Sequence, residues 1–361
     1  MRLEPPHSER ERPGIPVTVL YVGGPAGTNS FCRAQALERL GHRVRVLDPQ
    51  AGISRGRITD AINHRTGFRL SRRIIATRIS RAVSADTYDV AWVDDAAAVS
   101  RSLVRALHRV APVVLSHSSE DVFGVRDGHR WDTYRAAIPE YDLVVVVRDH
   151  NVDETLNAGA RAVHRVWRCY DEVAHAPVSL SVDDRHKWGS RVVFVGQWMP
   201  ERGPFLVDLL QRGVALAIYG PRWHRAPEWP VLREFVRGGY LRGADYARAI
   251  QSASVCLGLV SVGSRDLSTT RSVEIPALGG LLCAERTSEH SALYEDRVEA
   301  LLWSSADECA ALCSKMLAEP KLAAAIARRG QARVRSLRLG NEDLAHEILR
   351  VAGVGNLPEA S

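Results

Sequence analysis

The residues best suited to chemistry lie in one short stretch, from Asp266 to Gly280, which reads DLSTTRSVEIPALGG. A polar loop leads into a short apolar helix that ends at a glycine pair. The first N–H groups of a helix and its dipole attract an anion such as a diphosphate. Arg271 adds positive charge, and Glu274 can accept hydrogen bonds from two sugar hydroxyls. Three hydroxyl side chains precede the helix and can cap it or bind phosphate: Ser268, Thr269 and Thr270.

The same spacing also fits an ordinary capped helix with Glu274 in solvent, and the stretch alone does not decide between the two. Apolar runs at 253–262 and 281–284 flank it and predict a strand on each side. The elements that must position these residues are therefore a strand, a loop, a short helix, a glycine turn and a second strand.

Length and charge narrow the function classes. A chain of 361 residues predicts two domains, each large enough to bury its own core. The net charge is +6, and almost all of the basic residues are arginine. Such a balance suits nucleic acid, an anionic membrane surface or phosphorylated ligands. No basic run is interleaved with stacking aromatic residues, which makes nucleic acid an unfavoured partner.

Cysteine usage and hydropathy give the expected compartment. The six cysteines form no CxxC pair and several lie in apolar segments, so we expect reduced core residues without disulfides or a zinc site. The first 16 residues lack the apolar core of a signal peptide. No apolar run reaches the ~18 residues of a membrane span. We therefore expect a cytoplasmic protein.

Short apolar strands alternate with helices in two successive halves of the chain. This pattern predicts the α/β class, with two Rossmann-like, doubly wound parallel-sheet domains facing each other across a cleft. The expected boundaries are a disordered lead-in at 1–14, an N-terminal domain at 15–170, a linker at 171–190, a C-terminal domain at 191–335, and a C-terminal helix and tail at 336–361 that can cross back to the N-terminal domain.

The N-terminal half offers its own candidates. His117 follows a predicted strand, and an imidazole can take a proton from an acceptor hydroxyl near neutral pH. Glu120, Asp121 and Asp95 can do the same, although an ordinary polar loop residue is the commoner case for each. A Gly-rich loop after the first strand can line a phosphate or acceptor site, or can simply form a turn: Gly24, Gly27, Thr28 and Asn29.

Arginines also recur along the predicted helical region 53–82. Arg72, Arg73, Arg78 and Arg81 form one basic face. This face can contact an acidic acceptor or a membrane surface, although a solvated face is the commoner case.

From Arg191 to about Gly353, the order of motifs resembles the C-terminal domain of GT-B glycosyltransferases, most closely the CgeB-like and family-1/4-like members. The N-terminal half is similar only in general shape. The segments that carry the resemblance are Phe-Val-Gly196 with Glu201-Arg202-Gly203, Tyr219-Gly220, Leu241-Arg-Gly243 with Tyr246, Ser272 to Gly280, and Leu301–Trp303 with Asp307-Glu308.

The resemblance implies transfer of a sugar from a nucleotide-diphosphate donor to an acceptor held by the N-terminal domain, without a metal or a further cofactor. By position, Glu274 would hold the ribose hydroxyls. Arg202 would contact the diphosphate near Gly196, and Tyr219 and Gly220 belong to the same donor site. Asp266 stands eight residues before Glu274, where many retaining members have Glu, so we expect retention of configuration. Gln197 stands where a second Arg is common, and Arg271 or Arg265 can replace it.

Other functions stay open. The same fold serves nucleotide-sugar epimerases and phosphorylases, and a degenerate site would leave a non-catalytic sugar- or nucleic-acid-binding protein. The expected partners are a nucleotide sugar and a small-molecule, glycan or peptide acceptor, with peripheral membrane contact as a further possibility. The sequence does not reveal the donor base, the sugar, the acceptor or the oligomeric state.

Overall fold

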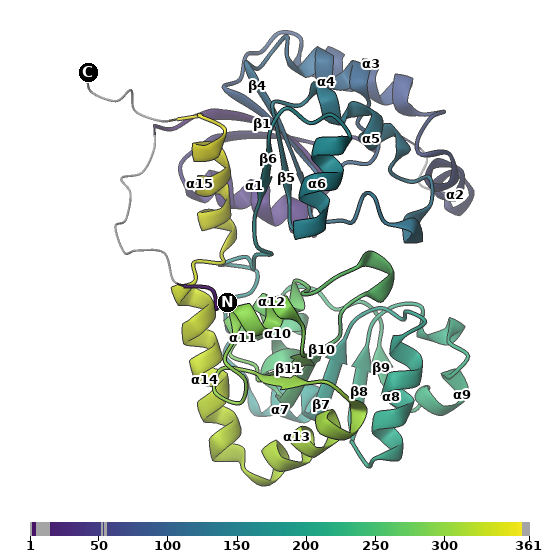
Figure 1. Ribbon diagram of the computed structural model, residues 1–361, viewed down its shortest axis with the longest axis vertical. Coiled ribbons are helices and arrows are strands. Elements are labelled where there is room, and N and C mark those ends of the chain that lie inside the picture. Colours follow the sequence, from purple (N-terminus) through teal and green to yellow (C-terminus); the bar gives the residue numbers. More distant parts are fainter. Residues whose placement is uncertain (1, 5–14, 52, 54–55, 356–361) are drawn as a thin grey trace. The chain divides into compact units, whose positions relative to one another are not determined.

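The computed structural model describes residues 2–4, 15–51, 53 and 56–355, in two compact units (Figure 1). The N-terminal unit comprises Glu9–Trp167, Gly263–Arg265 and Asn341–Ser361. The C-terminal unit comprises Met1–Ser8, Arg168–Val262 and Asp266–Gly340. The predicted lead-in at 1–14 lies outside the described residues, except for residues 2–4.

A parallel six-stranded sheet forms the centre of the N-terminal unit, in the order β2-β1-β3-β4-β5-β6. Most of its central strands are apolar along their whole length because helices cover both faces of the sheet. The strands are β1 (Thr18–Val22), β2 (Arg43–Leu47), β3 (Val90–Asp94), β4 (Val113–Ser118), β5 (Leu143–Val146) and β6 (Val163–Arg165).

Helices α1 (Asn29–Arg39) and α15 (Asn341–Val351) pack together on one face of this sheet (Figure 1). Helices α3 (Arg72–Val83), α4 (Arg101–Leu107) and α5 (Asp132–Ala137) cover the other face. The last helix of the chain thus belongs to the N-terminal unit. The remaining elements are α2 (Arg57–Thr66), α6 (Asp149–Asn157) and the 3₁₀ helices η1 (Val125–Asp127) and η2 (Ile138–Glu140).

The C-terminal unit contains a second parallel six-stranded sheet, in the order β12-β11-β10-β7-β8-β9. The chain builds outward from β7 in one direction and then restarts on its other side with β10. Open α/β sheets bind ligands outside the carboxyl ends of the strands at such a switch point. The strands are β7 (Ser190–Val195), β8 (Leu216–Tyr219), β9 (Val236–Gly238), β10 (Ala253–Gly258), β11 (Leu282–Glu285) and β12 (Leu301–Trp303).

Helix α8 (Arg202–Gln211) packs against α13 (Ala306–Ala318), and α11 (Arg271–Ala277) packs against α14 (Pro320–Ser336). The other helices of this unit are α7 (Val182–Trp188), α9 (Trp229–Leu232), α10 (Gly243–Gln251) and α12 (Ser288–Leu293), with the 3₁₀ helix η3 (Trp223–Arg225); a further one, η4 (Val262–Ser264), lies where the two units divide the chain.

The range 171–190, where we expected a linker, contains α7, which packs against α10 inside the C-terminal unit. Ser181 and Asp184 form a capping box that starts this helix. The predicted α/β class with two Rossmann-like parallel sheets is confirmed. Within the described part of the chain, no helix combines the length and the hydropathy needed to cross a bilayer.

Candidate active site

The stretch from Asp266 to Gly280 folds as the sequence predicts, with a loop and the short helix α11 between β10 and β11. Helix α11 begins after Thr270, whose side chain makes no capping hydrogen bond. The preceding loop is fixed instead by Ser268, whose hydroxyl donates to Glu289, and by the Thr269 N–H, which donates to Ser272 Oγ at 3.0 Å. These two hydroxyl residues therefore anchor the loop.

Glu274 is fully buried at the centre of this site. Its Oε2 accepts hydrogen bonds from the Tyr246 hydroxyl at 3.1 Å and from the Arg271 guanidinium. Burial alone would raise the pKa of Glu274, but the Arg271 charge and the neighbouring His175 outweigh it and lower that pKa. Glu274 is thus a buried carboxylate and not the solvated side chain of an ordinary capped helix.

The second oxygen of Glu274, Oε1, makes no hydrogen bond with any residue that the structure describes. His175 Nε2 lies 3.5 Å from it. His175 Nδ1 accepts the Asp171 N–H at 2.8 Å, so a neutral imidazole carries its proton on Nε2, facing Oε1. A buried acceptor without a partner is costly, which makes Oε1 a candidate contact for a ligand hydroxyl.

Arg271 links this carboxylate to the carboxyl end of β7. Its Nε donates to the carbonyl of Val195, the last residue of β7, at 3.2 Å. The guanidinium carbon lies 4.4 Å above the Tyr246 ring. The side chain is 26% exposed, and its Nη2 donates to none of the described residues. Arg271 therefore keeps N–H donors and a positive charge available at the switch point.

Arg202, the first residue of α8, is buried and donates to three backbone carbonyls. Nη1 bonds the Gln197 carbonyl at 3.0 Å, and Nη2 bonds those of Leu259 and Val260 at 3.0 and 3.3 Å. Arg202 thus joins the loop after β7 to the loop after β10. Its Nε has no partner among the described residues, and burial lowers its pKa. The predicted contact with a diphosphate stays a prediction.

Asp266 is mostly buried and forms an ion pair with Arg168, whose Nη2 lies 2.8 Å from Oδ1. Both side chains are about one-tenth exposed. The role of Asp266 toward a donor sugar stays a prediction, and any ligand at this carboxylate would share it with Arg168.

Gly196 and Gly220 meet where the loops after β7 and β8 cross. Gly220 has a φ of 147°, and a Cβ at this position would lie 2.0 Å from the Gly196 carbonyl oxygen. The Gly196 N–H donates to the carbonyl of the buried Tyr219 at 2.9 Å. Gly196, Tyr219 and Gly220 therefore determine the backbone path beside the switch point. The motifs predicted that these residues bind the donor.

A chain of hydrogen bonds fixes the start of α11 to β11. His290 Nδ1 lies 2.7 Å from the Glu285 carbonyl, and a carbonyl can only accept, so Nδ1 carries the proton. His290 Nε2 then accepts the Ser272 hydroxyl at 2.7 Å. Burial lowers the pKa of His290 to about 4, so the imidazole is neutral near neutral pH.

In the N-terminal unit, the ends of β3 and β4 bring His117 and Asp94 together. His117 is buried, and its Nδ1 lies 2.6 Å from Asp94 Oδ1. Arg33 Nη2 bonds Asp94 at 2.7 Å and Asp95 at 2.8 Å. Burial alone would raise the pKa of Asp94, but Arg33 and His117 lower it strongly. Because Asp94 is ionised, it accepts a proton-bearing Nδ1, which leaves Nε2 as the basic nitrogen of a neutral His117.

The other N-terminal candidates lie nearby in the same unit. Glu120 is 3.6 Å from Arg126, and desolvation together with the Asp95 charge raises the pKa of Glu120. Thr28 caps α1 by accepting the Phe31 N–H, and the Gly24 N–H donates to Ser30 Oγ. Gly27, with a φ of 81°, forms the turn, and Asn29 begins α1. Gly24 also lines a hollow of about 230 Å³ together with Asp94 and Asp95.

Four partners of the predicted residues were not identified as such from the sequence. Arg33 contacts Asp94, and Arg168 contacts Asp266. His175 and Tyr246 both contact Glu274. Tyr246 belongs to the family-like segments, so a motif marked it. The other three stand in no recognisable motif, because their roles depend on tertiary contacts.

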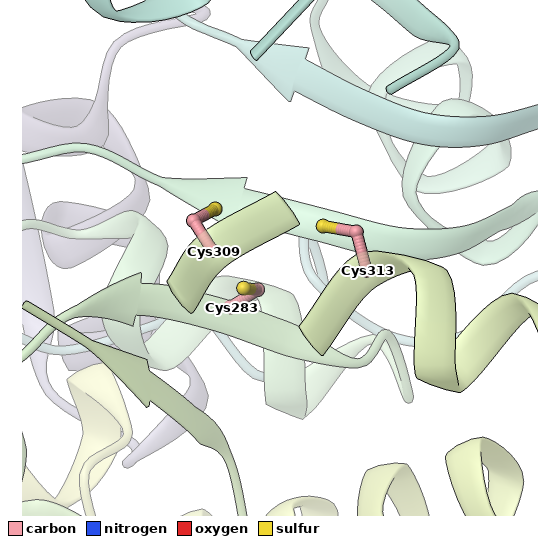
Figure 2. Close-up of side chains that lie close together, drawn as sticks. All are labelled: Cys283, Cys309 and Cys313. Atoms are coloured by element: carbon pink, nitrogen blue, oxygen red, sulfur yellow. The ribbon is translucent and has the colours of Figure 1, made fainter. Parts of the chain in front are cut away.

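Among the residues that the structure describes, two groups of side chains have the composition of a metal site. Cys283 on β11 faces Cys309 and Cys313, which lie one turn apart on α13, with the three sulfurs within 4.8 Å of one another (Figure 2). All three are buried among apolar side chains. Asp121, His150 and Glu154 form the second group. Arg265 pairs with Asp121 at 2.7 Å and with Glu154 at 2.8 Å. The guanidinium of Arg265 therefore already supplies positive charge to this second group.

Comparisons with known proteins address the activity class and the fold. The family model described as "Glycosyl transferase-like" matches residues 202–349, which include α8, α11 and the residues around Glu274. No curated protein sequence matches the chain.

Several solved structures share the fold at low sequence identity. HepE from Anabaena in complex with UDP-glucose is 14% identical, with a TM-score of 0.62 over 93% of this chain and 99% of that one. Sucrose-phosphate synthase from Thermosynechococcus elongatus is 14% identical, with a TM-score of 0.64 over 92% and 98%. α,α-Trehalose 6-phosphate synthase from Burkholderia multivorans is 14% identical, with a TM-score of 0.56 over 94% and 98%.

These structures show that the chain has the two-domain fold, and the family model matches the part of the chain that contains Arg202, Arg271 and Glu274. The expectation drawn from the motifs after Arg191 is thereby confirmed. Residues 202–349 are thus similar to the glycosyl transferase-like family, within a chain that has the GT-B fold of these structures.

Proposed function

We propose that this protein is a glycosyltransferase, which takes a sugar from a nucleotide-diphosphate sugar and transfers it to an acceptor hydroxyl. The observation that carries the proposal is the ion pair between the partly buried Arg271 and the buried Glu274, beside the carboxyl end of β7. This pair joins a positive charge with unused donors to a carboxylate oxygen without a hydrogen bond. HepE, which has the same fold, is a protein with a known UDP-glucose complex, so UDP-glucose is the first donor to test.

The transfer needs a stabilised leaving group. When the bond between the anomeric carbon and the diphosphate oxygen breaks, negative charge grows on the diphosphate. Arg271 supplies a fixed charge and N–H donors for that charge, and Arg202 holds the neighbouring loops in place. Fixed positive groups in a partly dehydrated site stabilise such charge better than water does. The proposed reaction therefore needs no metal ion.

The nucleotide would be recognised through its ribose. A ribose hydroxyl can donate to Glu274 Oε1, the oxygen that faces His175. The Glu274 side chain is only 1% exposed, so this contact requires a small movement of His175 or Arg271. Binding would then replace an unsatisfied acceptor with a satisfied one, which favours the bound state.

We also propose retention of configuration, with Asp266 near the donor sugar, and His117 as the group that takes the proton of the acceptor hydroxyl. Asp266 supports the first proposal through its position eight residues before Glu274. His117 supports the second because Asp94 fixes its Nδ1 as the protonated nitrogen. The anomeric configuration of the product, determined by NMR, tests the first. The dependence of kcat on pH in His117→Gln tests the second.

The donor proposal is tested by isothermal titration of UDP-, GDP- and TDP-sugars into the wild type, Glu274→Ala and Glu234→Ala. Glu234 is exposed and lies two residues before β9, so its variant is a control for loss of one carboxylate. We expect one donor class to bind the wild type and the control, and to bind Glu274→Ala about tenfold more weakly or not at all. The donor proposal fails if none of the nucleotide sugars binds the wild type. Product analysis without an acceptor identifies an epimerase, which would turn over the donor alone.

A further inference from the structure

A groove between helices α3 and α4 in the N-terminal unit has no part in the proposed transfer. It has a volume of about 710 Å³. Its lining is dominated by arginines, Arg72 and Arg73 from α3 and Arg101, Arg105 and Arg109 from α4 and the turn that follows it. Hydroxyl groups of Ser100, Ser102 and Thr133 complete the polar lining. We call these residues the α3–α4 groove.

The positive charge of the α3–α4 groove is only partly neutralised. Glu140 pairs with Arg105 at 2.8 Å and with Arg101 at 3.2 Å. No carboxylate among the described residues pairs with Arg72, Arg73 or Arg109, and all three side chains are exposed. Several guanidinium groups directed at one hollow repel each other unless an anion lies between them. Phosphate is the anion that guanidinium binds with matching geometry.

Helix α3 also exposes apolar side chains next to this charge. Ile74 is 66% exposed, and Leu70, just before the helix, is 71% exposed. Ile74 lines a second hollow of about 470 Å³ with Arg73, Arg78 and Arg81, so the apolar and basic residues share one surface. The opposite side of α3 is anchored in the core by Ile75, Ile79 and Val83. The helix is therefore held by one face while a basic and apolar face points outward.

We propose that the α3–α4 groove and the adjoining face of α3 bind the phosphate headgroups of an anionic lipid bilayer. Lipid phosphates neutralise Arg72, Arg73 and Arg109, while Ile74 and Leu70 enter the headgroup region. A soluble phosphate would satisfy the arginines but would leave both apolar side chains in water. A nucleic acid would be expected to meet stacking aromatic residues, and the groove residues include none.

The proposal is independent of the proposed donor site, because these residues belong to the N-terminal unit and take no part in the donor contacts. The test is cosedimentation of the full chain with vesicles of phosphatidylcholine alone or mixed with phosphatidylglycerol. We expect sedimentation only with the mixed vesicles, and weaker binding as salt is raised. Ile74→Ser should lower the part of the binding that persists at high salt.

Charge reversal locates the binding surface. The variant Arg72→Glu, Arg73→Glu, Arg109→Glu removes the three unpaired arginines, and its affinity for mixed vesicles should fall about a hundredfold. The control Arg233→Glu, Arg328→Glu, Arg335→Glu changes the net charge equally at exposed arginines of the C-terminal unit. Circular dichroism checks that both variants fold. Donor binding should be unchanged in both, since neither touches Arg271 or Glu274.

Three results would overturn the proposal. The wild type could fail to sediment with anionic vesicles, or the groove variant and the control could bind them equally. The third result comes from titration with inorganic phosphate and glycerol phosphate. If the protein binds these compounds but does not bind vesicles, the groove is a site for a soluble ligand. In each case a measured donor affinity would still stand, so failure here is distinguishable from failure of the donor proposal.

Discussion

The proposed donor site depends on Glu274. Because Glu274 is buried, its charge also affects the free energy of unfolding. We predict that Glu274→Gln lowers the free energy of unfolding by about 3 kcal/mol, because Arg271 then lies partly buried without its counter-charge. Tyr246→Phe removes only one neutral donor to the same carboxylate and should cost about 1 kcal/mol. Urea unfolding measures both. Equal losses in the two variants would show that the Arg271 charge is not compensated by Glu274.

His290 should make the free energy of unfolding depend on pH in the acid range. Its pKa is lowered from 6.5 to about 4, so the unfolded chain binds a proton in this range that the folded chain rejects. The stability from the neutral imidazole is therefore complete above pH 6.5 and is lost as the pH falls through 4. The expected loss is about 3 kcal/mol.

The matched variant for this prediction is His290→Gln. A glutamine amide can still accept from Ser272 and donate to the Glu285 carbonyl, but it does not titrate. Between neutral pH and pH 4, the free energy of unfolding of the wild type should fall more steeply than that of the variant. Parallel curves would mean that His290 titrates normally in the folded protein.

At the scale of single residues, the sequence predicted which residues belong to the candidate site better than it predicted the residues that contact them. Glu274 and Arg271 were found because helix starts, phosphate binding and family motifs all pointed to the same segment. The contacts of Arg168 with Asp266 and of Arg33 with Asp94 join residues 98 and 61 positions apart. No local spacing encodes such pairs, because the fold alone brings them together.

The loops after β7 and β8 cross so closely that one added methyl group should destabilise the protein there. We predict that Gly220→Ala destabilises the C-terminal unit by about 3 kcal/mol or more, because its Cβ would overlap the Gly196 carbonyl oxygen. Gly213→Ala is the control: its φ is 79°, but nothing lies within 4 Å of the added Cβ. That change should cost about 1 kcal/mol from the left-handed backbone alone. Similar melting temperatures for the two variants would contradict the steric argument.

Elements with a clear apolar period were predictable, and those without one were not. The strands beside the Asp266–Gly280 stretch are continuous apolar runs and form β10 and β11. Helix α7 is polar along most of its length, so its range resembled a linker. Its capping box, Ser181 with Asp184, was the available signal. The expected boundary at 335/336 before a C-terminal helix lies close to the break at residues 337–340, which separates α14 from α15.

At the scale of the whole molecule, the sequence predicted two α/β halves in order, but it left open where the last helix packs. Amphipathic periodicity shows that α15 has an apolar face without showing which surface accepts it. In the structure, Leu344, Ile348 and Leu349 are buried, and α15 packs on α1. Glu347 lies 2.7 Å from His164, and Glu342 lies 2.5 Å from Arg39. The end of the chain therefore completes the core of the half that comes first.

Truncation tests this arrangement. Ending the chain at Gly340 removes α15 and exposes the face of α1 beneath it, which should cost the N-terminal unit about 5 kcal/mol from three lost aliphatic side chains. Hydrogen exchange should speed up in α1 and β2, while β7 and β10 keep their protection, since those strands belong to the other unit. Loss of protection in β7 and β10 with α1 unaffected would assign α15 to the C-terminal unit. The donor affinity of the truncated chain adds a second readout: it should persist, because Glu274 and Arg271 lie in the unit that keeps its core.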